Sequence, residues 1–168
     1  MTVDPTALAD LAPLIVVDHP VVADRLAQLR DRETDNFAFR RLTAELSGFV
    51  AYEALRDLTT EIVTVATPVG DDTDARRISE SPLLVPILRA GLGMVPAIVS
   101  MLSAVEVAHV GLRRDEQTLR SALYLDALPA SLTGRRVVVC DPMLATGGTL
   151  IQDWTPAMAS PDTLNAMK

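Results

Sequence analysis

The chain has 168 residues, of which 49% are hydrophobic, and a formal net charge of −7. This length and apolar content are sufficient for one soluble globular domain with a buried core. The negative charge argues against a nucleic-acid or membrane partner, because the phosphates of either would repel the protein. No apolar run approaches the roughly 20 residues that cross a bilayer, and the N-terminus lacks the basic start of a signal peptide. The single cysteine, Cys140, allows no intrachain disulfide, so we expect a cytoplasmic protein.

The first half of the chain predicts an N-terminal arm over residues 1–17 and then two helices. Pro20 suits the first position of a helix, where its missing N–H costs nothing, and apolar residues follow it at helical spacing. His19, just before this helix, is expected to be structural. A second helix is predicted from Asp35 or Asn36, both good N-caps, to about Leu58. Its core face should carry the apolar residues Leu42, Leu46, Phe49 and Val50.

The rest of the chain alternates apolar runs with helical stretches. Residues 61–69 predict a strand, and the polar residues 69–81 predict a loop or a hairpin arm. Residues 81–104 and 135–152 each read as strand, glycine-bearing loop and helix, and residues 105–118 as a strand with a charged loop. This order indicates an α/β fold with a parallel sheet covered on both faces. Ligands bind beyond the carboxyl ends of such strands, so the loops after Leu88, Leu112 and Cys140 should share one crevice.

The stretch VVVCDPMLATGGTL, residues 137–150, has the features of an anion-binding turn. Residues 145–149 offer consecutive backbone N–H groups without bulky side chains, at the expected start of a helix, which suits a phosphate. Thr149 could add a hydroxyl. The carboxylate of Asp141 would repel a bare phosphate but would accept hydroxyls or a metal ion, and a ribose 5-phosphate presents hydroxyls on one side and phosphate on the other. The stretch matches neither the Walker A motif nor the dinucleotide fingerprint.

Two arginines are expected at the same edge. All basic residues except Lys168 are arginine, which excludes chemistry that needs a lysine within the fold but leaves bidentate binding of phosphate by guanidinium. Arg89 follows a predicted strand, and Arg114 lies in the charged loop. Together with the anion-binding turn they would clamp a strongly anionic group such as pyrophosphate. The alternative is that the glycine turns serve packing only and the arginines are solvated surface residues.

Three segments resemble uracil phosphoribosyltransferases: VPILRAGLGM at 85–94, VGLRRDEQTL at 110–119 and, above all, CDPMLATGGT at 140–149. Weaker matches lie in DHPVV, in FRRLTAELSGFVAYEALRDL and at Tyr124, so that the resemblance covers about residues 17–152. The Asp141–Pro142 pair is specific, because most other phosphoribosyltransferases have two adjacent acids there. The resemblance implies a phosphoribosyltransferase-like parallel sheet flanked by helices, with an N-terminal helical region, in a single domain over residues 1–168.

The resemblance also implies transfer of a 5-phosphoribosyl group from phosphoribosyl pyrophosphate (PRPP) to uracil, which gives UMP and pyrophosphate. Mg²⁺ would arrive with PRPP rather than on ligands of the protein, and relatives assemble as homo-oligomers. Arg89, Arg114 and Asp141 would be the catalytic residues, and Arg114 is preferred to Arg113 because relatives often have an aromatic residue at 113. Binding of PRPP would fall to Arg89, Arg114, Asp141, Pro142, Met143, Leu144, Ala145, Thr146, Gly147, Gly148 and Thr149.

The tail, residues 153–168, diverges from the family. Relatives continue to a glycine-rich segment that binds uracil, whereas Pro156 and Pro161 would break a continuing helix and no further apolar strand follows. The sequence therefore predicts a C-terminally truncated core with no assigned uracil-binding residues. Three hypotheses remain: a uracil phosphoribosyltransferase, a truncated homologue that binds PRPP without transferring its sugar, and an α/β domain whose glycine turns are purely structural.

Overall fold

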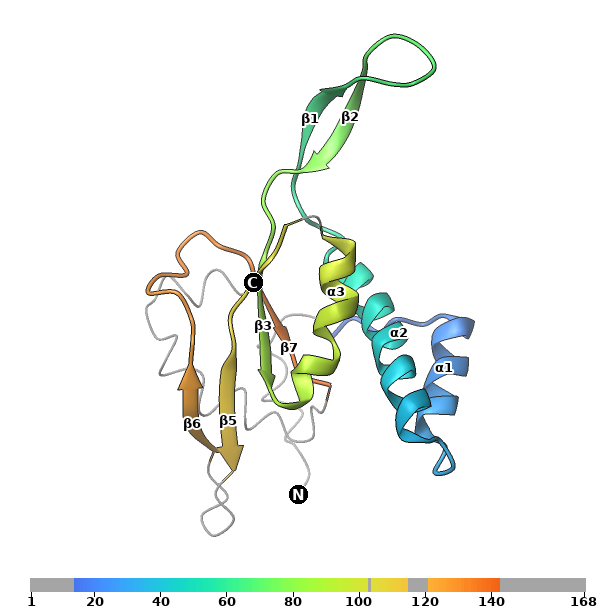
Figure 1. Cartoon of the computed structure of the whole chain (residues 1–168), viewed down its shortest axis with the longest axis vertical. Coiled ribbons are helices and arrows are strands. Elements are labelled where there is room, and N and C mark those ends of the chain that lie inside the picture. Colours follow the sequence, from blue (N-terminus) through green and yellow to red (C-terminus); the bar gives the residue numbers. More distant parts are fainter. Residues whose placement is uncertain (1–13, 103, 115–120, 143–168) are drawn as a thin grey trace.

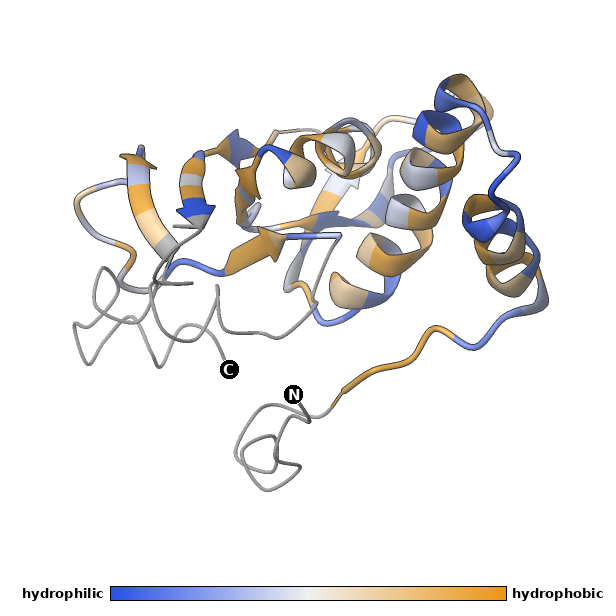
Figure 2. Cartoon of the chain, turned by 90° about the horizontal axis from the view of Figure 1, so that it is seen from below, coloured by the Kyte–Doolittle hydropathy of each residue, from blue (hydrophilic) through white to orange (hydrophobic). Residues whose placement is uncertain are grey.

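The computed structural model describes residues 14–102, 104–114 and 121–142. A sheet and three helices form the body, and a hairpin projects from one end of it (Figure 1). Most of the predicted arm, the anion-binding turn 143–149 and the divergent tail lie outside the described residues. Residues 14–17 have no regular secondary structure and form an extended apolar segment apart from the sheet (Figure 2).

The two N-terminal helices begin where the sequence predicts. Helix α1 spans Pro20–Arg30, and Nδ1 of its N-cap His19 accepts a hydrogen bond from the Val21 N–H at 3.1 Å, which confirms a structural role. Helix α2 spans Asn36–Ala54 and is capped by Asp35, whose Oδ1 accepts hydrogen bonds from two N–H groups of the first turn, at 2.9 and 2.7 Å.

The predicted end of α2 is wrong, and its predicted core face is right at Leu42 but wrong at Phe49 and Val50. The helix stops at Ala54 rather than near Leu58, because residues 55–58 form a tighter turn in which Asp57 pairs with Arg136 at the start of the sheet. The buried residues of α2 are Leu42, Ser47 and Ala51, whereas the predicted Phe49 and Val50 are 38% and 45% exposed. Of these, Ala51 packs into an apolar cluster with Ile98 of helix α3, Val95–Met101.

The sheet is built around strand β3, Leu83–Leu88. On one side it pairs in parallel with β7, Val137–Cys140, and on the other with β4, Glu106–Val107, and β5, Val110–Arg114 (Figure 1). The parallel pairing around β3 confirms the predicted fold class. The outer strand β6, Ser121–Asp126, was not predicted and is antiparallel to β5, so the sheet is mixed. Only residues 115–120 separate β5 from β6, which is too short for the crossover that a parallel neighbour needs.

Strand β3 is buried on both faces. Leu83, Val85 and Ile87 pack into one apolar cluster with β5 and the loop after β6. Leu84 packs into a second cluster on the helix side, with α2 and with α3, Val95–Met101. This double burial explains why LLVPIL is apolar without alternation. Cys140, at the end of β7, belongs to the helix-side cluster and is 1% exposed, and burial raises its thiol pKa to about 11.

The projecting hairpin consists of β1, Thr60–Val65, and β2, Thr73–Ile78, paired antiparallel as the polar segment predicts. It lies at the end of the molecule opposite the carboxyl ends of β3, β5 and β7 (Figure 1). Within the described part of the chain, no helix is both long and apolar enough to cross a membrane.

Candidate functional site

The carboxyl ends of β3, β5 and β7 meet at one edge of the sheet, as predicted. The three strands run in the same direction and therefore deliver Arg89, Arg114 and Asp141 to this edge (Figure 1). Strand β5 extends two residues beyond the predicted end at Leu112, so Arg114 is its last residue rather than part of a loop. The reason is that the antiparallel partner β6 continues to pair along it, up to Arg114 with Ser121.

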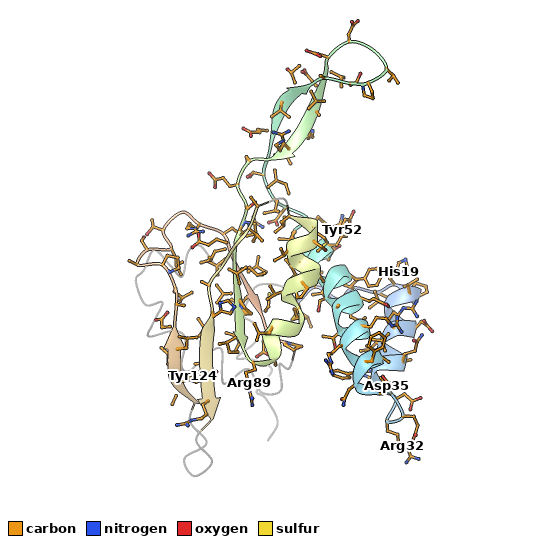
Figure 3. The ribbon with its side chains drawn as sticks, in the orientation of Figure 1. His19, Arg32, Asp35, Tyr52, Arg89 and Tyr124 are labelled. Atoms are coloured by element: carbon orange, nitrogen blue, oxygen red, sulfur yellow. The ribbon has the colours of Figure 1, made fainter. Side chains whose placement is uncertain are left out.

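Arg89 is an exposed cation at the carboxyl end of β3 (Figure 3). It follows a cis peptide bond from Leu88 and precedes a short 3₁₀ helix, Ala90–Gly93. In contrast to Arg135 and Arg136, which pair with Glu106 and Asp57, Arg89 has no ion-pair partner among the described residues. Its charge is therefore available to an anionic ligand.

Gly91 brings the loop after β3 against the end of β7. A Cβ at this position would collide with the carbonyl oxygen of Cys140 and would lie 3.1 Å from both Cα and Cβ of Pro86. The absent side chain thus allows the backbone beyond Arg89 to lie directly on the residue before Asp141. Arg89 and Asp141 are consequently held on two segments whose relative position is fixed by a close contact.

A hollow of roughly 590 Å³ opens at the same edge, lined by Leu88, Arg89, Leu112, Arg113 and Tyr124. Arg113 and Tyr124 are absent from the predicted site. Arg113, on β5, contributes its exposed side chain to this hollow. Tyr124 was recognisable as a match to the family, but its place in the hollow depends on β6, which the sequence did not predict.

Asp141 directly follows Cys140, the buried last residue of β7, and is half-buried, whereas Pro142 is exposed. The remaining predicted PRPP-binding residues lie outside the described residues: Met143, Leu144, Ala145, Thr146, Gly147, Gly148 and Thr149. The described ranges contain no group of three or more His, Cys, Asp or Glu side chains that could hold a metal ion.

Comparisons with known proteins show which family this chain is similar to. The model of the family "Uracil phosphoribosyltransferase" matches residues 16–154. A uracil phosphoribosyltransferase from Streptomyces avermitilis is 53% identical over 138 residues, which are 82% of this chain and 65% of the relative. Another from Kineococcus radiotolerans is 52% identical over the same shares of both chains. The solved structure of the AQ2163 protein from Aquifex aeolicus superposes with a TM-score of 0.73 at 35% identity, over 81% of this chain and 65% of that one.

The fold and the cationic sheet edge thus define a phosphoribosyltransferase-type α/β domain. The chain belongs to the uracil phosphoribosyltransferase family. It spans about 65% of the length of the curated relatives that it matches.

Proposed function

We propose that this protein transfers the 5-phosphoribosyl group of PRPP to uracil, forming UMP and pyrophosphate in pyrimidine salvage. The observation that carries the proposal is the meeting of Arg89, Arg114 and Asp141 at the carboxyl edge of three parallel strands. The family match and the names of the relatives support it. Residues Met143 to Thr149 are proposed to bind the 5-phosphate through backbone N–H groups.

The chemistry needs fixed positive charge more than it needs a nucleophilic side chain. The bond between the anomeric carbon and the pyrophosphate oxygen breaks and the sugar acquires oxocarbenium character. A uracil ring nitrogen forms the new bond and loses its proton to solvent. Arg89 and Arg114 are proposed to stabilise the charge that develops on the departing pyrophosphate. Loss of one such preorganised group costs on the order of 10²–10³ in rate.

Magnesium is proposed to arrive with PRPP. A hard cation of this kind takes oxygen ligands, and substrate phosphates with one or two carboxylates are its usual partners. Asp141 would supply a carboxylate at this edge, and its other proposed role is to accept hydrogen bonds from the ribose hydroxyls. The bound cation would neutralise part of the diphosphate charge.

The test is formation of UMP from radiolabelled uracil, PRPP and Mg²⁺ by the 168-residue protein, alongside calorimetric titration with PRPP. UMP formation that requires Arg89 is the expected result. Binding of PRPP without UMP would instead identify the homologue that binds without transfer. The absence of both would leave only the purely structural hypothesis.

A homo-oligomer is also proposed, assembled through the hairpin end. A two-stranded hairpin alone is marginally stable in water, yet β1 and β2 project from the body with Ile62 69% exposed. At the hairpin base a hollow of roughly 370 Å³ is lined largely by apolar side chains, among them Tyr52, Ile78 and Met101. A second copy is expected to cover these surfaces, and light scattering should show a dimer or larger species that Ile62→Glu dissociates. A monomeric wild type would contradict this.

The proposed location is the cytoplasm. Cys140 is the one cysteine of the chain and is a buried free thiol, which suits a reducing compartment. Fractionation of the producing cells, followed by detection of the protein, tests the location, and recovery outside the cytoplasmic fraction would contradict it.

A further inference from the structure

Tyr124 lies at an irregularity in the outer part of the sheet. In the antiparallel pairing of β5 with β6, Gly111 is opposite Leu125 and the next residue, Leu112, is opposite Leu123. Tyr124 is therefore an extra residue without a partner on β5, which is a β-bulge. Bulges change the direction of a side chain and are common beside active sites.

The bulge lays the phenol ring of Tyr124 over Gly111. A Cβ at Gly111 would lie 2.5 Å from Cζ and 2.6 Å from Cε2 of the ring, so the hydroxyl-bearing end of the ring covers this glycine. Gly111 is in turn the partner of Leu88 in the pairing of β3 with β5. The hydroxyl end of Tyr124 thus lies over the strand that neighbours Leu88, the residue immediately before Arg89.

Apart from its contact with Gly111, Tyr124 does not take part in the apolar packing of the sheet. The residue is 56% exposed, belongs to neither apolar cluster and lines the hollow that Arg89 and Arg113 also line. Figure 3 shows Tyr124 and Arg89 at the same edge of the sheet, from β6 and from the loop after β3. Its hydroxyl makes no hydrogen bond with any residue in the described ranges.

We propose that Tyr124 is a substrate-binding residue whose hydroxyl donates a hydrogen bond to the diphosphate of PRPP beside Arg89. The inference rests on the proposed function. A phenol is a neutral O–H donor, and the hydrogen bond from such a donor to a charged oxygen is stronger than one between neutral groups. Gly111 and the bulge in β6 have the role of holding the ring so that its hydroxyl reaches the cationic hollow.

Two substitutions test this assignment by different routes. Tyr124→Phe removes the hydroxyl and keeps the ring, whereas Gly111→Ala keeps the hydroxyl and pushes the ring away. Matched controls are Tyr52→Phe, which removes the hydroxyl of a 69% exposed tyrosine on α2, and Gly48→Ala, at a glycine whose added Cβ would meet no atom within 4 Å. The ligands are inorganic pyrophosphate with Mg²⁺ and ribose 5-phosphate, each titrated by calorimetry.

Tyr124→Phe and Gly111→Ala should each weaken pyrophosphate binding by about 10-fold or more, with ribose 5-phosphate binding and both controls unchanged. The double variant should bind pyrophosphate no more weakly than the weaker-binding single variant, because the two substitutions remove the same hydrogen bond. Unchanged pyrophosphate affinity in Tyr124→Phe would overturn the inference and leave the proposed function intact. An equal loss of affinity for pyrophosphate and ribose 5-phosphate would also overturn the inference, because it would indicate general distortion of the protein. A wild-type protein that binds neither pyrophosphate nor PRPP overturns the proposed function itself.

Discussion

Replacement of Gly91 by alanine should damage both the fold and the candidate site. The added Cβ would collide with the carbonyl oxygen of Cys140 and lie 3.1 Å from Cα and Cβ of Pro86. These neighbours belong to β7 and β3, whose backbones are held by parallel pairing and cannot simply turn aside as a flexible side chain could. Overpacking of this kind costs about 1–3 kcal/mol, and the rigid neighbours place Gly91→Ala near the upper end.

The prediction is measured by urea and thermal unfolding. A loss of about 2–3 kcal/mol corresponds to a fall in Tm of roughly 4–12 °C for a protein of this size. Pyrophosphate binding should weaken at 20 °C, where the variant is still folded, because the loop that carries Arg89 can no longer lie against the residue before Asp141. Gly48→Ala is the control, since it adds the same methyl group where no atom lies within 4 Å and should stabilise α2 by roughly 0.5–1 kcal/mol.

Unchanged stability and unchanged binding in Gly91→Ala would refute the reasoning, because they would mean that the two segments are not in contact in solution. A loss of stability with full pyrophosphate affinity would support the contact between Gly91 and the end of β7 but would refute the role of this contact in placing Arg89.

Three further predictions concern charge and protonation. Arg89→Gln should lower kcat/KM by about 10²–10³ without changing Tm, since Arg89 is exposed and has no ion-pair partner in the described part of the chain. Burial raises the pKa of Cys140 from 9.0 to about 11, so the folded state favours the neutral thiol. About 2–3 kcal/mol of the free energy of unfolding is therefore fully present below pH 9 and should be lost as the pH rises to about 11. The hydrogen bond from Arg136 lowers the pKa of Asp57, so Asp57→Asn should destabilise the protein near pH 7 and progressively less below about pH 4, as monitored by unfolding at each pH.

Each of these has its own control. Arg77→Gln, on the exposed strand β2 far from the site, should leave kcat/KM unchanged, and an equal loss there would point to a general effect of net charge. Cys140→Ala should remove the alkaline loss beyond pH 9, and its persistence would assign that loss to other groups. If wild type and Asp57→Asn differ equally at pH 7 and pH 3, the pairing with Arg136 does not lower the pKa of this carboxyl.

The sequence predicted those elements whose signals are local. Pro20 and Asp35 mark helix starts through the chemistry of single residues, and LLVPIL is apolar throughout because β3 is buried on both faces. The core face of α2 was only partly predicted. The burial of Ser47 and Ala51 depends on the helices that pack against α2, and hydrophobic periodicity gives no information about them. Strand β6 was missed since its residues alternate weakly and its existence depends on pairing with β5.

In the candidate site, too, residues with a local sequence signal could be predicted and residues that depend on strand pairing could not. Arg89 and Asp141 could be predicted because each directly follows an apolar strand, and parallel strands bring their carboxyl ends together. Arg113 and Tyr124 could not be predicted, because their place at the hollow depends on the antiparallel pairing of β6 with β5 and on the bulge in β6. The contact between the ring of Tyr124 and Gly111 depends on the bulge in β6, which the sequence does not reveal.

Strand β3 has three pairing partners, contributes to both apolar clusters and leads directly into Arg89. Its amides should be among the last to exchange with deuterium, because they become accessible only when the whole sheet opens. A substitution that loosens β3 should therefore lower the thermal stability and also displace Arg89. The hairpin lies at the opposite end from Arg89, so substitutions in it should affect the proposed assembly rather than the cationic edge of the sheet.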